Sequence, residues 1–461
     1  MSARPSVDRA SNSPRFVSGS LLRHVAVMSG TGAIGLIAIF LVDLINLFYI
    51  SLLGQQAVAA AVGFAGVVGF FQLSFCIGLM IAVAAVVAPA IGAGQHAEAQ
   101  RLGTVSLLLM GLTCSLLALL SYAALDPLLS LLGASGETKT QAHNYLQISL
   151  ASTPLLGLSM ACSALLRAAG DARRAMNVTL IGALITAALD PLLIFALHLD
   201  LQGAAIAAVL ARLCMLLVGL HGVTRAHQLL GPLQIDRLGA DNRRLCQVAG
   251  PAILANLATP CGGAFITHAM AQFGPAAVAG QATIERLTPV AFGLVYALSG
   301  AVGPIIGQNL GAGRLDRVQQ TLRSSLLFMG LVVAVAWLLL ALGQSLIIRA
   351  FSAEGLTAEL IGLFCSLLAA SFLFVGALFV ANTTFNNLDR PLYSTAFNWA
   401  RATLGTIPFA YLGAHFGPAG VLIGPAIGAV IFGSLALWMA LRLTAKLAEA
   451  SSAAKPTTPP T

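Results

Sequence analysis

Residues 25–53 read VAVMSGTGAIGLIAIFLVDLINLFYISLL and are apolar almost throughout, with one carboxylate at Asp43. A helix of about 20 apolar residues crosses the core of a lipid bilayer, and this stretch is long enough. A carboxylate inside such a helix costs about 2.5–3.5 kcal/mol, so it persists where it faces a partner or water. The alternative interpretation is that Asp43 is a buried side chain whose contacts only hold two helices together. One helical stripe, which we expect to face the protein interior, consists of Gly32, Gly35, Ile39, Asp43, Asn46 and Ile50.

The composition of the whole chain extends this interpretation. The 461 residues are 58% hydrophobic and 9% charged, whereas a soluble domain carries about 25% charged residues. We therefore expect an all-α polytopic membrane protein. The net charge of +8 comes from basic residues in polar connections, where they set the orientation of a membrane protein, so nucleic-acid binding is not indicated.

Twelve apolar segments are predicted. The longest polar connection, 224–247, separates an N-terminal six-helix lobe, 21–223, from a C-terminal six-helix lobe, 248–442. The polar ends 1–20 and 443–461 have no signal-peptide pattern and are expected to be disordered tails. The segments lie at about 25–51, 57–88, 103–124, 143–166, 177–197, 203–223, 248–272, 278–306, 324–348, 358–386, 394–414 and 418–442.

The loop charges predict the orientation. With twelve spans both termini lie on one side of the membrane, and the other side carries only Lys139 and Arg349. Cytoplasmic loops are rich in Lys and Arg, so we expect both termini to be cytoplasmic. The basic residues on the side of the termini are Arg101, Arg167, Arg173, Arg174, Arg225, Arg237, Arg243, Arg244, Arg314, Arg317, Arg390, Arg442 and Lys446.

The two halves repeat. GQQAVAAAVG at 54–63 is similar to GPAAVAGQAT at 274–283, and VAPAIGAGQ at 87–95 is similar to VGPIIGQNLGAG at 302–313. LLRAAGDARRAM at 165–176 corresponds in position to FNNLDRPLYS at 385–394. Secondary transporters place their substrates near the middle of the membrane at the interface of such repeats. The repeat therefore favours a transporter of small molecules.

Three carboxylates lie inside predicted spans: Asp43, Asp190 and Glu285. The direction of each span places each of them about 10 Å below the outer surface, so we expect them to meet around one outward-opening cavity. Their equivalents in the other half are uncharged, at about Gly263, Ile407 and Ala65. Packing requirements repeat between halves, and these charges do not. We therefore predict that the three carboxylates couple transport to an ion.

Polar side chains near these carboxylates are candidates for contact with a substrate. Thr186 lies one turn before Asp190 and is placed to hydrogen-bond to it, and Pro191 follows Asp190 and predicts a kink. A polar stripe accompanies Glu285. The candidates are Asn46, Thr186, Gln281, Thr288 and Tyr296.

Motifs of soluble catalysis are absent from the sequence. It has no P-loop GxxxxGK[ST], no GxSxG and no HExxH. The eight histidines show no metal-ligand spacing, and the seven cysteines lie singly without a CxxC pair. We therefore expect no enzyme activity, no cofactor and no metal site, and we expect the cysteines to be small core residues.

Five stretches of the sequence resemble motifs of the prokaryotic branch of the multidrug and toxic compound extrusion (MATE) family. The resemblance extends over about residues 20–445. The resemblance is carried by FLVDLINLFYISLLG at 40–54, LLRAAGDARRAMN at 165–177, LDPLLIF at 189–195, GPIIGQNLGAG at 303–313 and FNNLDRP at 385–391. It implies two six-helix lobes in a V around a central cavity. It also implies export of amphipathic, often cationic, drugs or toxic compounds from the bacterial inner membrane in exchange for H⁺ or Na⁺, and we expect a monomer.

The resemblance also implies site residues, and some positions depart from the family pattern. Asp43 matches the cation-coupling aspartate of the first helix, and Asp190 matches the acid of the fifth. Glu285 matches an acid in the eighth helix of some prokaryotic members. The family usually has an asparagine four residues before the fifth-helix acid, and this position is Thr186 here. The position eighteen residues after that acid is often a threonine in the family, and it is Ala208 here. The acid of the seventh helix in some branches is absent near residues 259–260. These departures favour H⁺ as the coupling ion.

Two hypotheses other than an exporter disagree with features of the sequence. A lipid-linked precursor flippase of the wider superfamily carries extra helices and a more cationic cavity, and the twelve segments with few intramembrane arginines disagree with that. A membrane enzyme or receptor requires clustered catalytic groups or an attached soluble domain, and neither is present in the sequence. A Na⁺-coupled exporter of the same family remains an alternative.

Overall fold

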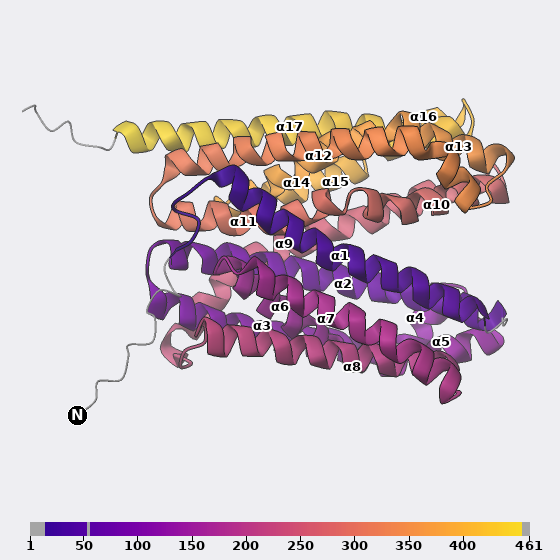
Figure 1. The fold of residues 1–461 in the computed structure, drawn as a ribbon, viewed down its shortest axis with the longest axis horizontal. Helices are drawn as coiled ribbons and strands as arrows, with labels where there is room; N and C mark the ends of the chain where they lie inside the picture. Colours follow the sequence, from indigo (N-terminus) through magenta and orange to yellow (C-terminus); the bar gives the residue numbers. More distant parts are fainter. Residues whose placement is uncertain (1–13, 53–55, 454–461) are drawn as a thin grey trace, which may run out of the picture. The chain divides into compact units, whose positions relative to one another are not determined.

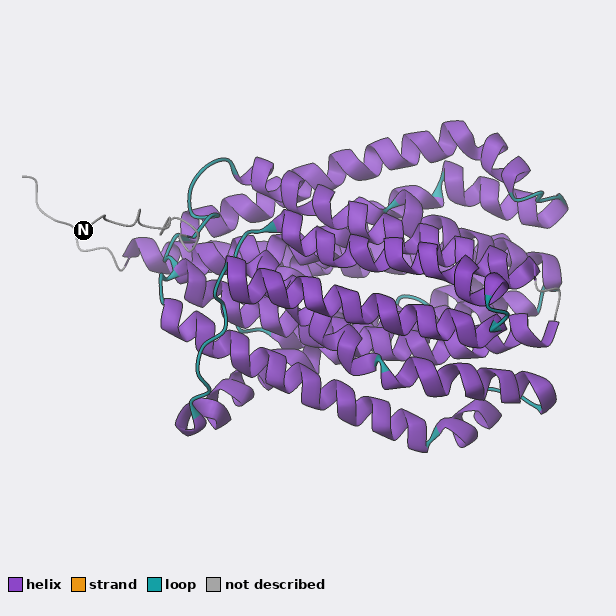
Figure 2. Ribbon diagram, turned by 60° about the horizontal axis from the view of Figure 1, so that its bottom comes forward, coloured by secondary structure: helices purple, strands orange, loops and turns teal. Residues whose placement is uncertain are grey.

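The computed structural model describes residues 14–52 and 56–453, and nearly all of them are helical (Figure 2). No strand occurs among these residues. A bilayer offers no water to backbone N–H and C=O groups, and helices satisfy these groups within the segment. The predicted all-α fold class is confirmed. The parts of the predicted tails at 1–13 and 454–461 lie outside the described residues.

The chain divides into two compact units. Unit 1 contains residues up to 18 and 34–249, and unit 2 contains 19–33 and the residues from 250 onward. Two helices are shared between the units: α1 (Leu21–Leu52) changes unit after residue 33, and α9 (Ile235–Ala271) changes after 249. The further elements assigned to unit 1 (Figure 1) are α2 (Gln56–Gly92), α3 (His96–Ala123), α4 (Leu125–Leu131), α5 (Gly136–Ala151), α6 (Thr153–Ala168), α7 (Ala172–Pro191), the π-helix η2 (Leu192–Ala196), α8 (Asp200–His221) and the π-helix η3 (Gly222–Ala226).

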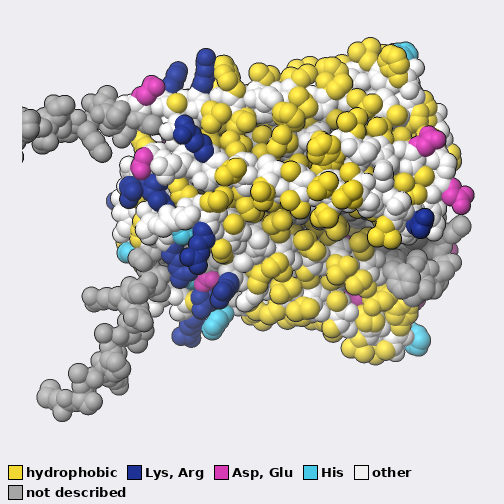
Figure 3. All heavy atoms as spheres, turned by 45° about the horizontal axis from the view of Figure 1, so that its top comes forward, with side chains coloured by type: hydrophobic (Ala, Val, Ile, Leu, Met, Phe, Trp, Pro, Cys, Tyr) yellow, Lys and Arg dark blue, Asp and Glu magenta, His cyan; other side chains and the backbone are white. Residues whose placement is uncertain are grey.

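Unit 2 contains a similar series of helices. Its elements after α9 are α10 (Pro275–Ala291), α11 (Gly293–Gly311), α12 (Leu315–Ala350), α13 (Gly355–Ser366), the 3-10 helix η4 (Leu368–Ser371), α14 (Phe372–Asn387), α15 (Pro391–Ala402), α16 (Ile407–Ala414) and α17 (Pro418–Ala453). On the face drawn in Figure 3, Lys and Arg side chains gather at one end of the helices, and hydrophobic side chains cover the helix sides. Helices with apolar sides and charged ends are typical of a protein that crosses a bilayer.

Nine helices of the described chain are long and apolar enough to cross a membrane, and the number is eleven when two bent pairs each count as one span. The bent pairs are α5 with α6, at 44°, and α10 with α11, at 50°. The remaining predicted segment, 394–414, is divided between α15 and α16 by a turn at 403–406. Threonine and glycine occupy three of the four turn positions, and both are weak helix formers.

The internal repeat predicted from the sequence is visible in the backbone. Gly94 and Gly313 both have a positive φ, +72° and +69°, at the turns after α2 and α11. Gly170 and Asp389 also share a positive φ, +80° and +56°, at the turns before α7 and α15. Both pairs are separated by the same number of residues along the chain. Left-handed backbone is uncommon outside glycine, so its recurrence at matched turns supports two equivalent six-helix halves.

The bend between α5 and α6 has a visible cause and a visible compensation. Pro154 lies in the first turn of α6 and lacks the N–H that would continue the helix. The carbonyl of Ser149 at the end of α5 accepts from the backbone N–H of Ser152 at 3.2 Å and from its hydroxyl at 2.8 Å, and a further donor comes from another helix. The guanidinium of Arg212 on α8 donates to the carbonyl of Ser149 at 3.0 Å and to the Ser152 hydroxyl at 2.6 Å. A cation at a helix C-terminus is also electrostatically favourable.

In unit 2 the corresponding break lies at the end of α13. There the indole N–H of Trp337 on α12 donates to the carbonyl of Ser366 at 2.8 Å. The two halves therefore satisfy the carbonyls of their broken helices with different side chains, an arginine in one and a tryptophan in the other.

The predicted polar connection 224–247 is shorter in the structure than in the sequence analysis, because η3 ends at Ala226 and α9 begins at Ile235. The charged residues between 235 and 247 extend α9. The connection is held against α3: Arg101 contacts Asp241 at 2.7 and 3.3 Å. The Thr104 hydroxyl donates to the carbonyl of Gly231 at 2.8 Å. Unit 1 thus fixes the first turns of the helix that continues into unit 2.

The predicted tails need correction at their inner ends. Phe16 is 2% exposed, and Gly170, without a side chain, leaves room for Arg15 and Phe16. Burial of an aromatic ring explains why residues 14–20 are ordered rather than part of the predicted tail 1–20. At the other end, α17 continues to Ala453, past the predicted end of the lobe at 442.

Asp171 organises the turn before α7. Its side chain accepts a hydrogen bond from the backbone N–H of Arg174 at 3.1 Å and caps the helix. The ring nitrogen Nε2 of His227 lies 2.9 Å from the same carboxylate, and the Arg174 guanidinium also contacts it. Burial opposes ionisation of this carboxyl, but the contacts with His227 and Arg174 outweigh it and hold the pKa of Asp171 below its usual range.

We expect Asp171→Asn to lower the unfolding temperature at pH 7, and we expect the difference from wild type to shrink as the pH falls. A carboxyl with a lowered pKa in the folded state stabilises the protein above its unfolded pKa of about 3.9, and this contribution is lost on acidification. Asn keeps the capping oxygen, so the difference reports the charge. The measurement is thermal unfolding in detergent from pH 7 to about pH 3.5. Asp316→Asn, at an exposed position, is the control; a pH-independent difference would contradict this interpretation of Asp171.

Helix α17 packs through glycines against α16 and the turn before it, and this contact generates a second prediction. A Cβ at Gly428 would overlap the carbonyl of Gly405, and one at Gly420 would overlap the carbonyl of Gly413. We expect Gly428→Val to destabilise the protein by about 1–3 kcal/mol through overpacking, measured as a lower midpoint of thermal unfolding in detergent. Gly343→Val on α12, where nothing lies within 4 Å, is the matched control and should unfold like wild type. Equal midpoints for Gly428→Val and wild type would show that the helices separate freely here.

Candidate functional site

Two contacts align α1 with α7 in unit 1. A Cβ at Gly35 would lie 3.1 Å from the Cβ of Thr179, so the two helices nearly touch there. Further along both helices the rings of Tyr49 and Phe195 meet edge to face, with centroids 5.7 Å apart. Asp43 lies between Gly35 and Tyr49, and Asp190 lies between Thr179 and Phe195. The small residue and the aromatic pair therefore bring the two aspartates to the same level of unit 1.

The two aspartates have different surroundings. Asp190 is 1% exposed, and its Oδ1 has no hydrogen-bond partner among the described residues. Asp43 is exposed at the surface of unit 1.

The backbone around Asp190 is irregular. Pro191 follows it, and α7 continues as the π-helix η2. A proline removes one helical N–H, and a π-helical turn shifts the bonding register, so carbonyl groups near the carboxylate lose their regular donors. Such π-turns occur frequently at functional sites. The kink predicted at Pro191 thus takes the form of a change of helix type.

The polar candidates near the aspartates behave differently from one another. The Oδ1 of Asn46, one turn after Asp43 on α1, is buried and has no partner in the part of the chain described. Thr186 does not bond to Asp190 as the sequence suggested. Its hydroxyl donates to the carbonyl of Gly182 at 3.0 Å, because a threonine in a helix can reach the carbonyl four residues earlier. Asn46 and Asp190 therefore present acceptor oxygens without donors.

Sequence reasoning missed Tyr145 and gave Arg212 no definite role. Tyr145 on α5 packs against the buried hydrophobic cluster of unit 1. The only sequence signal for Tyr145 is its place in the polar start of an apolar segment, HNYLQIS at 143–149. Arg212 donates to the broken end of α5, as described above, and so has a structural contact in unit 1.

In unit 2, Glu285 lies exposed on α10. The side-chain amide of Gln281, one turn earlier, donates to its Oε1 at 2.9 Å. The Oε1 of Gln281 is buried without a partner among the described residues. Thr288 donates its hydroxyl to the carbonyl of Ile284 at 2.7 Å. Of the predicted stripe on this helix, Gln281 and Glu285 are therefore the pair that interacts.

The predicted segment 278–306 is not one straight helix. It bends by 50° between α10 and α11, at Phe292, which is fully buried and stacks on Phe372 with centroids 4.1 Å apart. Pro289 and Gly293 flank the bend and weaken the helix there. Tyr296 consequently lies on a separate helix from Glu285. It packs near Phe379, at 5.6 Å between ring centroids.

The predicted grouping of three carboxylates has two parts. Asp43 and Asp190 both belong to unit 1, and Glu285 belongs to unit 2. A cavity shared by the three carboxylates stays a prediction. The described residues contain no group of three His, Cys, Asp or Glu side chains arranged to hold a metal ion. What unit 1 provides is a buried carboxylate oxygen of Asp190 and a buried amide oxygen of Asn46, both without a donor among the described residues.

Comparison with known proteins identifies the family. A family model described as MatE matches residues 33–192 and 251–412, most of each half. The chain belongs to the MatE family. The resemblance noted in the sequence is therefore confirmed, and with it the classification as a multi-pass membrane transporter rather than an enzyme. Transporters of this family bind small-molecule substrates and use ion gradients.

Two relatives span almost the whole MatE chain. It is 31% identical over 435 residues to a FAD transporter of Shewanella oneidensis, covering 93% of this chain and 96% of the relative. It is 23% identical over 440 residues to the multidrug export protein MepA of Staphylococcus haemolyticus, covering 94% and 96%. The family relationship thus extends over both lobes.

Solved structures of MATE transporters share the fold. A mutant of the Vibrio cholerae transporter VcmN matches with a TM-score of 0.88 at 26% identity, covering 92% of this chain and 97% of that one. The outward-facing conformation of a multidrug resistance MATE transporter of the MOP superfamily matches with a TM-score of 0.90 at 19% identity, covering 96% and 100%. The second likeness shows the fold alone.

The close approach of α1 and α7 predicts a specific sensitivity. We expect Gly35→Val to force α1 away from Thr179, to shift Asp43 from Asp190 and to abolish most transport while the protein still reaches the membrane. Transport in membrane vesicles, with membrane levels measured by immunoblot, checks this. Gly30→Val on the same helix, where nothing lies within 4 Å, should keep its activity. Full activity in Gly35→Val would mean that the alignment of the two helices is not required.

Proposed function

We propose that this MatE transporter is a secondary antiporter that exports amphipathic compounds in exchange for H⁺. The observation that carries the proposal is the buried Oδ1 of Asp190, which has no donor among the described residues. The Gly35–Thr179 and Tyr49–Phe195 contacts bring Asp43 of α1 to the same level of unit 1 and form the Asp43–Asp190 pair. An ionised carboxylate in an apolar, membrane-embedded site is costly unless a cation or proton joins it. A pair of this kind binds a proton in one state of the transporter and releases it in another.

A proton suits these residues better than Na⁺. A sodium ion needs several oxygen ligands around it, and the family's usual fifth-helix asparagine is Thr186 here, with its hydroxyl donated to the carbonyl of Gly182. Ala208 offers no side-chain oxygen. A proton needs only one carboxylate oxygen and can be shared within an acidic pair. The alternative, Na⁺ coupling, requires Asn46 and backbone carbonyls near Pro191 to complete the coordination.

The proposed cycle follows from charge. When a proton arrives from outside, one aspartate of the pair becomes neutral, the repulsion between the two disappears, and the kinked end of α7 repacks. Repacking releases the substrate outward. When the site next faces the cytoplasm, the proton leaves, and the restored negative charge attracts a cationic substrate. Glu285 of unit 2, held by Gln281, contributes a further acid to ion coupling. Asn46, Thr186, Gln281, Thr288 and Tyr296 line the route of the substrate.

The orientation and location follow from the distribution of basic residues. Both termini are placed in the cytoplasm because Lys and Arg are concentrated in the connections on that side. We place the protein in the bacterial inner membrane, as a monomer with two six-helix lobes, 21–223 and 248–442. Each lobe contains its own broken helices and its own polar cluster, so one chain carries a complete transport unit.

Two substrate classes are proposed. Acidic residues at Asp43, Asp190 and Glu285 favour amphipathic cations, and export of multidrug type accords with the name of the MepA relative. A flavin dinucleotide is the second candidate, because the relative at 31% identity is named a FAD transporter. FAD carries phosphates, and a guanidinium such as that of Arg401, whose Nε is buried without a partner among the described residues, would recognise them.

The first experiment is transport in proteoliposomes with an imposed pH gradient in sodium-free buffer. Ethidium and FAD serve as separate fluorescent probes. We expect movement of at least one probe that depends on the pH gradient, and we expect Asp43→Asn to abolish it because the first acceptor of the proton is removed. Glu137→Gln, at an exposed position in the first turn of α5, is the matched control and should transport normally.

Each outcome has a distinct meaning. Transport that starts only when a Na⁺ gradient is imposed would contradict proton coupling and retain the exporter. Gradient-driven transport that is unchanged in Asp43→Asn would contradict the role of the pair. Movement of FAD but not ethidium would identify the dinucleotide as the substrate class, and the reverse result would identify cations.

A further inference from the structure

Three sulfur atoms meet in the buried interior of unit 1. The Sγ of Cys76 on α2 lies 3.7 Å from the Sγ of Cys114 on α3, and the Sγ of Cys114 lies 3.7 Å from the Sδ of Met110. Cys76 and Cys114 are 0% exposed and Met110 is 1% exposed. We propose that these side chains form a binding site for a soft monovalent cation of the Cu(I) or Ag(I) type.

The spacing of the sulfurs fits a shared metal. A metal–thiolate bond is about 2.3 Å long in zinc sites, so two sulfurs that bind one metal at tetrahedral to trigonal angles lie about 3.7–4.0 Å apart. Both measured separations meet this requirement without movement of the backbone. A disulfide bond would require the two Sγ atoms to approach to about 2.05 Å. The helices therefore hold the thiols at the distance for a common ligand.

The ligand set selects the class of metal. Thiolate and thioether ligands are soft and select Cu(I)-type ions. Structural zinc is almost always bound by four cysteine, histidine or carboxylate ligands, and no third side chain of these kinds joins the two cysteines among the described residues. A soft monovalent ion accepts two or three sulfur ligands. The thioether of Met110 is therefore the third ligand.

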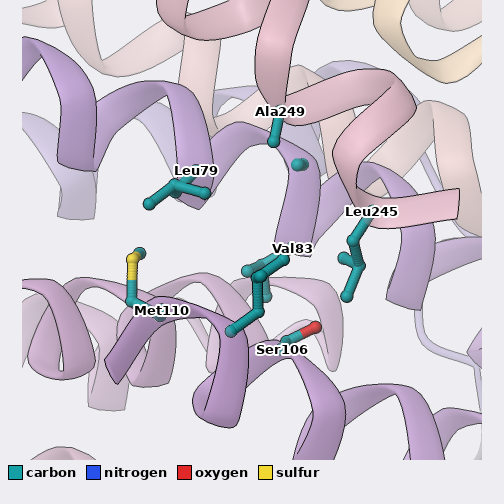
Figure 4. Close-up of a pocket in the computed structure, with 8 residues that line it drawn as sticks. Leu79, Val83, Ser106, Met110, Leu245 and Ala249 are labelled. Carbon is teal, nitrogen blue, oxygen red and sulfur yellow. The ribbon is translucent and has the colours of Figure 1, made fainter. Parts of the chain in front are cut away.

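The surroundings of the cluster provide space and charge. Gly157 on α6 has no side chain, and a Cβ there would overlap the Sγ of Cys114. A cavity of about 10 Å³ adjoins Met110, room for about one water molecule. Figure 4 shows the Met110 side chain among those around this cavity. Of the three sulfur-bearing side chains only Met110 lines this cavity, so it offers an approach to the thioether and not to the thiols.

The charge of the complex is balanced within unit 1. On binding, each S–H bond breaks as an S–metal bond forms, and two protons are released to the medium. Two thiolates with one monovalent cation carry a net charge of −1. Arg212, held in the same unit by its bonds to Ser149 and Ser152, carries the positive charge that compensates it. No electron transfer is involved, so no oxidant or reductant is required.

The test is a titration of the purified, reduced protein with Ag(I) in chloride-free buffer. Exposed Cys246 and Cys261 are first blocked with iodoacetamide, which leaves buried thiols unmodified. We expect native mass spectrometry to show one tightly held Ag(I), with a higher unfolding temperature and sulfur neighbours by X-ray absorption. Cys76→Ser and Cys114→Ser should each lose this ion, and Met110→Leu should weaken its binding by about tenfold or more.

The controls separate this site from other thiols. Cys365→Ser and Cys162→Ser, each of which removes another buried cysteine, should retain the ion. Unfolding temperatures without Ag(I) show that each variant is folded. Absence of a bound ion in the wild type, or an ion retained equally in Cys76→Ser and Cys114→Ser, would overturn the proposal. So would a Cys76–Cys114 disulfide in peptide mapping of the untreated protein. None of these readouts depends on transport.

Discussion

The absence of water in the bilayer interior is the constraint on which this structure depends. Every backbone N–H and C=O within the membrane needs a partner in the protein, so each interruption of a helix requires a specific compensation. Arg212 supplies it at the break between α5 and α6, and Trp337 supplies it at the end of α13. The segment after Pro191 keeps its backbone paired in another register, with the N–H of Leu197 on the carbonyl of Leu192 at 3.0 Å and that of Leu199 on the carbonyl of Leu193 at 3.1 Å. This change of register directly follows the buried carboxylate of Asp190.

Much of the fold could be predicted from the sequence, because hydrophobicity and charge act over whole segments. The apolar runs predict the spans, and the matched turns at Gly94 and Gly313 follow from the repeated motifs. The bends could not be predicted reliably. Pro289 lies near a bend of 50°, whereas Pro251 and Pro260 lie inside the continuous helix α9. Whether a proline bends a helix depends on which neighbours satisfy the freed carbonyls, and that information lies in other helices.

The candidate site, too, could be predicted from the sequence only in part. Asp43 and Asp190 could be identified from the sequence because a carboxylate in an apolar segment is costly at any depth. Their proximity depends on the Gly35–Thr179 and Tyr49–Phe195 contacts, which join residues far apart in the chain. Thr186 shows the limit of helical spacing as evidence, since its hydroxyl bonds to the backbone instead of Asp190. Cys76 and Cys114 show the converse, because single cysteines in separate helices carry no motif and only tertiary packing brings their sulfur atoms together.

Helix α1 belongs to both units, with its first residues assigned to unit 2 and Asp43 assigned to unit 1. A continuous helix is stiff, so bending strain introduced near Asp43 is carried along the same rod to the residues before 34. Gly30, Gly32 and Gly35 lie at the division, and glycine lowers the cost of distorting a helix there by about 1 kcal/mol per residue relative to alanine. Substituting Gly32 or Gly35 changes the elastic compliance of the rod as well as its packing, whereas a side chain at Gly30 meets nothing within 4 Å and acts on the compliance alone. The first helix is thus a mechanical element whose stiffness is set by three residues without side chains.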